Sequence, residues 1–100
     1  MDKENQTDIR LSAQRALWGH IPPSLRAFSA ELGDSVVRVR AIFDEKITEG
    51  DKELLSIANA EIISDYPEPY DINEEFLVIP TGDIMEHLQS LIYLRYESAR

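Results

Sequence analysis

The chain contains no cysteine, so disulfide bonds, zinc sites built on thiolates and cysteine nucleophiles are all excluded. A chain without thiols suits a reducing compartment, and we expect a cytoplasmic location. No segment approaches the roughly 18 to 20 apolar residues that a membrane span needs. The polar opening stretch, Met1 to Arg10, also lacks the apolar run of a secretory signal. We therefore expect neither export by such a signal nor a membrane partner.

Glycine and histidine are scarce, which limits the chemistry that the chain can perform. The four glycines are isolated from one another, so no glycine-rich phosphate loop exists and nucleotide binding is not indicated. The two histidines are His20, in a Gly/Pro connector, and His87, which follows Asp83 and Glu86. A catalytic or metal-binding role can be drawn for His87, but no spaced histidine pair and no strand-to-helix nucleophile elbow supports it.

The acidic run from 65 to 75 could in principle bind a hard cation, but it lacks the register and the glycine of a calcium loop. We therefore expect no enzymatic activity, no catalytic residue, no metal and no cofactor. With 100 residues, of which 43% are apolar, the chain can bury one modest core. We expect a single domain over residues 1–100, with 1–6 and 98–100 frayed.

Negative charge is in excess and is confined to one part of the chain. Nineteen acids stand against ten bases, which gives a net charge of -9. Eleven of the acids and only two of the bases lie between Asp44 and Glu75, whereas the rest of the chain carries eight of each sign. A field of this sign repels nucleic acid and attracts a cationic partner. The alternative is that the acidity serves only solubility.

Hydrophobic periodicity and turn residues predict six elements. A helix begins near Ile9, after Asp8, and ends at Gly19, because Pro22 and Pro23 cannot continue it. Strands over 25–32 and 36–43 flank a Gly-Asp-Ser turn and form a hairpin. A second helix runs from a Thr48–Asp51 capping box to about residue 66.

After that helix, a strand is expected over 71–79 and a last strand over 90–97, whereas 84–89 fits either a helical turn or a loop. The order α-β-β-α-β-β predicts an α+β fold. We expect a mostly antiparallel four-stranded sheet with two helices packed on one face.

Four arginines fall on the predicted strands: Arg26, Arg38, Arg40 and Arg95. Arginines on a sheet near tyrosines invite comparison with an RNA-binding sheet, but the aromatic spacing of such a sheet is absent. The net charge also opposes the approach of a phosphate chain. We interpret these arginines as a solvated sheet face paired with acids, and expect no direct binding of nucleic acid.

Two tyrosines, Tyr66 and Tyr70, bracket a Pro-Glu-Pro segment in the middle of the acidic third of the chain. Rigid aromatic rings surrounded by carboxylates have the composition of a protein-binding hot spot, where the rings supply contact area and the acids steer encounter. The alternative is an ordinary helix-to-strand loop whose tyrosines fold over the edge of the core.

Several segments resemble those of small bacterial proteins of about this length. These segments are Leu17 to Arg26 with its Ile-Pro-Pro-Ser-Leu-Arg ending, Val39 to Thr48 leading into Asp51 to Leu54, Ala60 to Pro67, and Leu91 to Glu97. Some proteins of that group are immunity proteins of contact-dependent growth inhibition and related polymorphic toxin systems. The resemblance implies a cytoplasmic antidote that binds one cognate toxin domain, often a nuclease, and blocks it.

Charge agrees with that implication, because a nuclease is cationic where it grips phosphates and carboxylates can compete for the same lysines and arginines. From charge we expect a partner-binding surface made by Asp44, Glu45, Glu61, Asp65, Tyr66, Glu68, Tyr70, Asp71, Glu74 and Glu75. The alternative function is a non-enzymatic interaction module or a homodimeric accessory protein.

Overall fold

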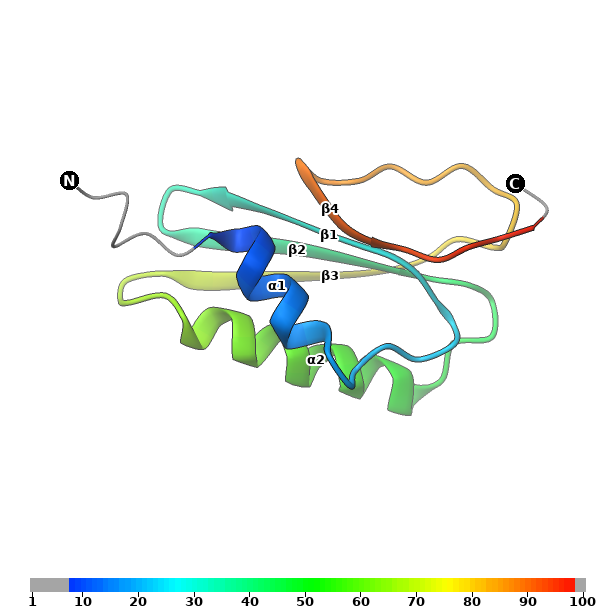
Figure 1. The fold of residues 1–100 in the computed structure, drawn as a ribbon, viewed down its shortest axis with the longest axis horizontal. Helices are drawn as coiled ribbons and strands as arrows, with labels where there is room; N and C mark the ends of the chain where they lie inside the picture. The colour runs from blue at the N-terminus through cyan, green and yellow to red at the C-terminus, as the bar shows by residue number, and fades with distance from the viewer. Residues whose placement is uncertain (1–7, 99–100) are drawn as a thin grey trace.

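The computed structural model of the chain describes residues 8–98. Its elements are α1 (Ile9–Leu17), β1 (Leu25–Gly33), β2 (Val36–Phe43), α2 (Glu49–Ser64), β3 (Asp71–Val78) and β4 (Ser90–Leu94) (Figure 1). The α+β class and the predicted order of elements are confirmed. The predicted fraying of 1–6 and of the last two residues concerns positions outside the described residues, and Ser98 is an exposed turn residue.

Side-chain caps fix where the two helices begin. The Asp8 carboxylate accepts a hydrogen bond from the Arg10 backbone amide at 3.0 Å, which satisfies one free donor of the first turn of α1. At α2 the predicted capping box forms in both directions between Thr48 and Asp51. Beyond α1, Gly19 adopts a φ of 80°, a backbone conformation that other residues rarely take, so the chain can turn towards β1.

The sheet is mixed, and its strands follow the order β3-β2-β1-β4. β1 pairs with β2 and with β4 in antiparallel fashion, whereas β2 and β3 run parallel. The parallel pair follows from the connection, because α2 carries the chain back along the sheet before β3 begins. Two of the three pairings are thus antiparallel, as expected, and the third differs because a helix replaces the tight turn of a hairpin.

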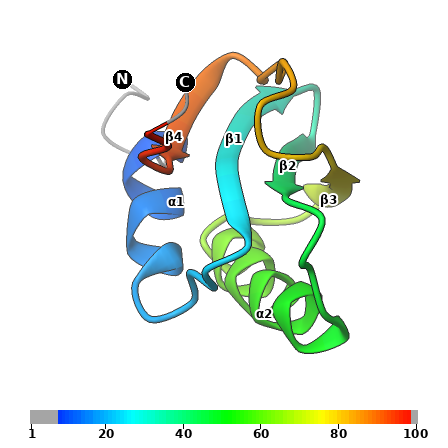
Figure 2. The same cartoon turned by 90° about the vertical axis from the view of Figure 1, so that its right-hand side faces the viewer.

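Both helices pack on one side of the sheet, where they enclose the core (Figure 2). The largest fully buried apolar side chains of this layer come from β1, β2 and α2; they are Phe28, Phe43, Leu25, Leu55, Ile62, Val37 and Val39. Ala13, Ala16 and Leu17 supply the contribution of α1. The apolar stripes that the periodicity predicts therefore meet across one interface.

The opposite side of the sheet is covered by the segment between β3 and β4, residues 79–89, which contains neither helix nor strand. Its backbone is tied to strand side chains: Arg40 Nη1 donates to the Glu86 carbonyl at 2.9 Å, and the Leu88 amide donates to Ser29 Oγ at 2.9 Å. Because the helices cover one face of β1 and this segment the other, six consecutive residues from Leu25 to Ala30 are buried. The structure thus resolves 84–89 as a loop.

The last strand is shorter than expected, since β4 ends at Leu94 rather than at 97. The chain nevertheless stays beside β1, because the Arg95 amide donates to the Arg26 carbonyl at 2.9 Å. Within residues 8–98, neither helix has the length and apolar character needed to cross a bilayer.

Candidate partner-binding surface

Seven of the ten residues predicted to bind a partner lie together at one end of the molecule. They come from the last turn of α2, the loop after it and the first half of β3: Glu61, Asp65, Tyr66, Glu68, Tyr70, Asp71 and Glu74. The connection from β2 through α2 to β3 explains this grouping, because α2 ends and β3 begins at the same end of the sheet, next to the start of β2. In the register of the parallel pair, Val36 lies beside Asp71.

The carboxylates of this group differ in whether other side chains of the protein pair with them. Glu61, Glu68 and Asp71 are exposed, and no ion pair joins them to a lysine or arginine within the described part of the chain. Asp65 accepts a hydrogen bond from Ser12 Oγ and lies 3.8 Å from Arg15 Nη2. At least three of the negative charges therefore remain available to solvent or to a partner.

Glu74 is held in place from α2 by neutral groups. Asn59 is fully buried and donates its Nδ2 to Glu74 Oε1 at 2.9 Å, and Ser56 Oγ donates to the same oxygen at 3.4 Å. Because neither group carries a charge, the negative charge of Glu74 is oriented but not neutralised.

Sequence reasoning missed two acids that the fold brings to the same end. Asp34 is exposed in the β1–β2 turn, next to Ser35, whose carbonyl accepts a hydrogen bond from the Asp71 amide at 3.0 Å. Asp8, the cap of α1, is close enough to Tyr66 to influence its titration. The parallel pairing of β2 with β3 accounts for the position of Asp34, and the packing of α1 beside α2 accounts for that of Asp8. We call Asp34, Glu61, Asp65, Glu68, Asp71 and Glu74 the acidic end.

The two tyrosines pack against each other and against the core instead of projecting into solvent. Their ring centroids lie 5.2 Å apart and both rings are half-buried. Burial, together with the nearby charge of Asp65, raises the pKa of Tyr66 to about 12. This arrangement agrees with the alternative interpretation of the loop, in which the rings cover the edge of the core and stiffen the acidic end from below.

The other three predicted residues lie elsewhere. Glu75 points to the opposite face of β3 and pairs with Arg40 at 2.8 Å. Asp44 and Glu45 follow Phe43 at the far end of β2, which lies about 23 Å along the strand from Val36, the residue beside Asp71, because seven residue steps each rise about 3.3 Å. Asp44 is only 7% exposed, so its carboxylate serves the interior and does not contribute to a surface.

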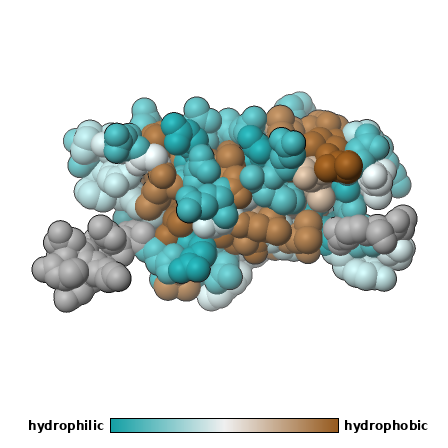
Figure 3. Space-filling model, turned by 90° about the horizontal axis from the view of Figure 1, so that it is seen from above, coloured by the Kyte–Doolittle hydropathy of each residue, from teal (hydrophilic) through white to brown (hydrophobic). Residues whose placement is uncertain are grey.

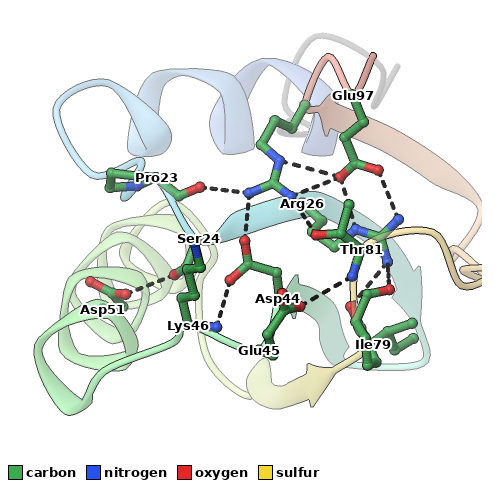
Figure 4. A network of polar contacts seen from close by, with 12 residues as sticks. Pro23, Ser24, Arg26, Asp44, Glu45, Lys46, Asp51, Ile79, Thr81 and Glu97 are labelled. Atoms are coloured by element: carbon green, nitrogen blue, oxygen red, sulfur yellow. Dashed lines mark hydrogen bonds and ion pairs between the residues drawn. The ribbon is translucent and has the colours of Figure 1, made fainter. Parts of the chain in front are cut away.

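A buried network of two arginines and two acids lies around Asp44 (Figure 4). Arg26 Nε and Nη2 donate to the two carboxylate oxygens of Glu97, both at 2.8 Å. Arg95 donates to Asp44 at 2.9 Å and to Glu97 at 3.0 Å. The interpretation of Arg26 as a solvated residue is wrong: it is 2% exposed, because the 79–89 segment covers the face onto which it points.

The network shifts the titration of Glu97 and Arg95. The hydrogen bonds from Arg26 hold the pKa of Glu97 at about 2, against the opposing effect of burial. Burial alone would lower the pKa of Arg95, but its hydrogen bonds to Asp44 and Glu97 raise it. Arg26, Arg95 and Glu97 are therefore charged at neutral pH, and the arginines lie against the carboxylates of the network. The network fastens the residues after β4 to β1 and to the end of β2, and it contributes nothing to the acidic end.

Arg26 also organises the 79–89 segment. Its Nη1 donates to the carbonyls of Ile79 and Pro80, both at 3.0 Å, and to that of Asp83 at 3.3 Å. Beside this contact lies a pocket of about 440 Å³, partly lined by Ile84, Met85 and Leu94. Ile84 is 89% exposed. Figure 3, which views this side of the molecule, shows hydrophobic side chains gathered among polar ones.

His87 lines the same pocket without a catalytic arrangement around it. Its Nδ1 is buried and has no hydrogen-bond partner among the described residues, and burial together with the charge of Arg40 lowers its pKa. Across residues 8–98, no group of three or more histidine and carboxylate side chains is placed to hold a metal ion. The geometry here is that of a neutral imidazole that fills space between the segment and the sheet.

Comparison with known proteins identifies the family of the chain. A search of curated proteins found no match to the chain. A family model described as MafI2 immunity protein matches residues 6–97, which span every element of the fold from α1 to β4. The match covers both the acidic end and the buried network, and it agrees with the resemblance to bacterial immunity proteins seen in the sequence. The chain belongs to the MafI2 immunity protein family.

Proposed function

We propose that this immunity protein neutralises its cognate toxin by binding it through the acidic end, and that the toxin is a cationic nuclease whose substrate-binding surface is blocked. Family membership supports an immunity role and a toxin partner. The observation that carries the proposed site is the convergence of exposed carboxylates from the β1–β2 turn, the end of α2 and the start of β3. The inhibitor performs no chemistry of its own.

Electrostatics explains how such a surface would inhibit. A nuclease grips the phosphate chain with lysines and arginines, and fixed carboxylates can take the place of the phosphates. The acidic end is fixed by the Ser12–Asp65 and Asn59–Glu74 contacts and by the packed tyrosines. Preorganised charges speed encounter and exclude substrate without a conformational change. We place this inhibition in the bacterial cytoplasm, in a contact-dependent or related polymorphic toxin system.

Charge reversal tests the site. We would replace Glu68 and Asp71 by lysine and measure, by calorimetry at low salt, the affinity for an inactivated form of the cognate toxin domain. The matched control replaces Glu53 and Glu86 by lysine, which changes the net charge equally at exposed positions outside the acidic end. We expect the first variant to bind at least about tenfold more weakly than the control, because like charges then oppose each other across the interface.

Two outcomes would contradict the proposal at different levels. If both variants bind as tightly as the unaltered protein, the acidic end is not the binding site. If the unaltered protein forms no complex with the toxin and does not reduce its nuclease activity, the proposed inhibition is wrong. A complex whose affinity is indifferent to salt would also contradict a mechanism based on charge.

A second candidate function, self-association or docking of a different protein, is favoured by the apolar surface near the end of α1. Trp18 is 72% exposed and lines a hollow of about 270 Å³ together with Ile21 and with Ile92 and Tyr93 of β4. Exposed apolar groups of this kind often mark contact surfaces. Light scattering tests it: a stable dimer that dissociates when Trp18 is replaced by serine would support this candidate, and a monomer at all concentrations would contradict self-association.

A further inference from the structure

The outer edge of β3 is open. β3 is the terminal strand of the sheet, and Figure 2 shows no helix or strand beyond it among the described residues. The backbone N–H groups of β3 point alternately towards β2 and away from it. The N–H of Asp71 donates to the Ser35 carbonyl and that of Ile79 to the Phe43 carbonyl, both on the β2 side. The odd-numbered amides between them therefore also face β2, and the even-numbered amides face outward.

The outward amides are those of residues 72, 74, 76 and 78. The first is already satisfied, because the Ile72 amide donates to Asp71 Oδ1 at 3.0 Å. Within residues 8–98, no strand pairs with the outer side of Glu74, Phe76 and Val78, so their backbone presents a row of donors and acceptors. Such a row is a template for an added strand.

The two edges of the sheet are not equivalent. β3 has eight residues and pairs with β2 in an unbroken register. β4, at the other edge, has five residues and its pairing with β1 shifts register between Phe28 and Ser29. Short and irregular edges resist further pairing, whereas long and regular ones accept it. β3 is therefore the edge that offers a continuous template.

The charge of β3 indicates which kind of segment can pair with its outer edge. β3 carries the acids Asp71, Glu74 and Glu75 and no lysine or arginine. A second copy paired edge to edge would bring these carboxylates close to their own equivalents, which is unfavourable. A segment with lysines or arginines would instead find opposite charges, foremost Asp71, which is exposed, and Glu74, which only neutral groups hold. The geometry and the charge thus disfavour a homodimer through this edge.

We propose that the β3 edge binds an extended, lysine- or arginine-bearing segment of the cognate toxin, which joins the sheet as a fifth strand. This inference rests on the proposed function and deepens it, because it adds main-chain hydrogen bonds to the charge contacts of the acidic end. The added strand would lie beside Glu74, Phe76 and Val78 and continue towards the acidic end at Asp71.

Amide hydrogen exchange, measured by NMR on the free protein and on its complex with the inactivated toxin domain, tests the pairing residue by residue. We expect exchange at Glu74, Phe76 and Val78 to slow at least about tenfold on binding. The amides of the odd-numbered neighbours, which already face β2, should change much less. If the complex forms and the three outward amides exchange as fast as before, the added strand is excluded, although toxin binding itself stands.

A proline variant gives a second test. Val78 is 52% exposed and its amide faces outward, so Val78→Pro removes an edge donor without removing a hydrogen bond to β2. Val78→Ala is the matched control, because it shortens the side chain and keeps the amide. We expect the proline variant to bind the toxin at least tenfold more weakly than the alanine variant. Equal affinities of the two folded variants would overturn the proposal; if the proline variant does not fold, the exchange experiment decides.

Discussion

Arg26 and Glu97, 71 positions apart in the sequence, form a bidentate ion pair in which both nitrogen–oxygen distances are 2.8 Å. The pair joins the middle of the sheet to the end of the described chain, and both side chains are almost fully buried. In this buried position each charge is stabilised by its partner, because water cannot solvate the charge if the partner is removed.

We therefore predict that Glu97→Gln is strongly destabilising. The substitution removes the charge that compensates Arg26 in the interior, whereas Arg95 keeps its ion pair with Asp44. Loss of one partner of a buried pair costs about 3 to 5 kcal/mol. Urea unfolding followed by circular dichroism measures the free energy of unfolding. Glu68→Gln, an exposed change of the same chemistry, is the control and should alter it by less than about 0.5 kcal/mol. Equal stability of the two variants would show that the network does not hold the chain end.

The same pair predicts how stability depends on acid. The pKa of Glu97 is about 2 in the folded protein, below the ordinary value of 4.5, so the unfolded chain binds the proton more readily. The contribution of Glu97 is fully present above pH 4.5 and is lost as the pH falls from 4.5 towards 2. Unfolding free energies measured across this range should fall less steeply for Glu97→Gln than for the unaltered protein. If the unfolding free energies of the two proteins fall in parallel with pH, the low pKa given to Glu97 is wrong.

His87 predicts a second dependence at milder pH. Burial and Arg40 lower its pKa below the ordinary 6.5, so the folded protein resists protonation that the unfolded chain accepts. The stability contributed by the neutral imidazole is present above pH 6.5 and declines as the pH falls below that value. We expect His87→Leu to lack this decline between about pH 7 and 5, with His20→Leu as the control that retains it. Thermal unfolding at a series of pH values distinguishes the two.

The start of α2 supplies the last prediction. Asp51 accepts hydrogen bonds from the Thr48 amide at 3.2 Å and from Ser24 Oγ at 2.7 Å, so it caps the helix and anchors the connector before β1. Thr48→Ala removes only a cap and should cost about 1 kcal/mol. Asp51→Ala should cost more, because it loses both contacts. Chemical unfolding of the two variants tests the order, and a larger effect of Thr48→Ala would contradict the role given to Asp51.

Local patterns were sufficient to predict most of the secondary structure. The capping box at Thr48, the paired prolines after α1 and the alternation of β2 all act between residues close in sequence, so they can be recognised without a structure. The parallel pairing of β2 with β3 was not among these predictions, because it depends on the path of α2 across the sheet. That pairing is what brings Asp34 to Asp71, and for this reason Asp34 was missed.

The buried network was missed for a related reason. Strict alternation would place Arg26 on the same face of β1 as Phe28, but the register of β1 shifts between Leu25 and Ala27. The residues that bury Arg26, 79–89, have no periodicity of their own. Their position is set by side chains from distant strands, such as Arg40 and Ser29, that bind their backbone. A contact of this kind leaves no trace in local sequence. The charge of Asp44 was therefore counted as part of the surface although the fold uses it internally.

The way Arg26 holds the 79–89 segment has an evolutionary consequence. It binds the carbonyls of Ile79, Pro80 and Asp83, and a carbonyl is present whatever amino acid a codon specifies. The outward side chains of Ile84 and Glu86 can thus be exchanged freely while the scaffold persists. Side chains of this stretch can therefore vary during evolution at little risk to folding.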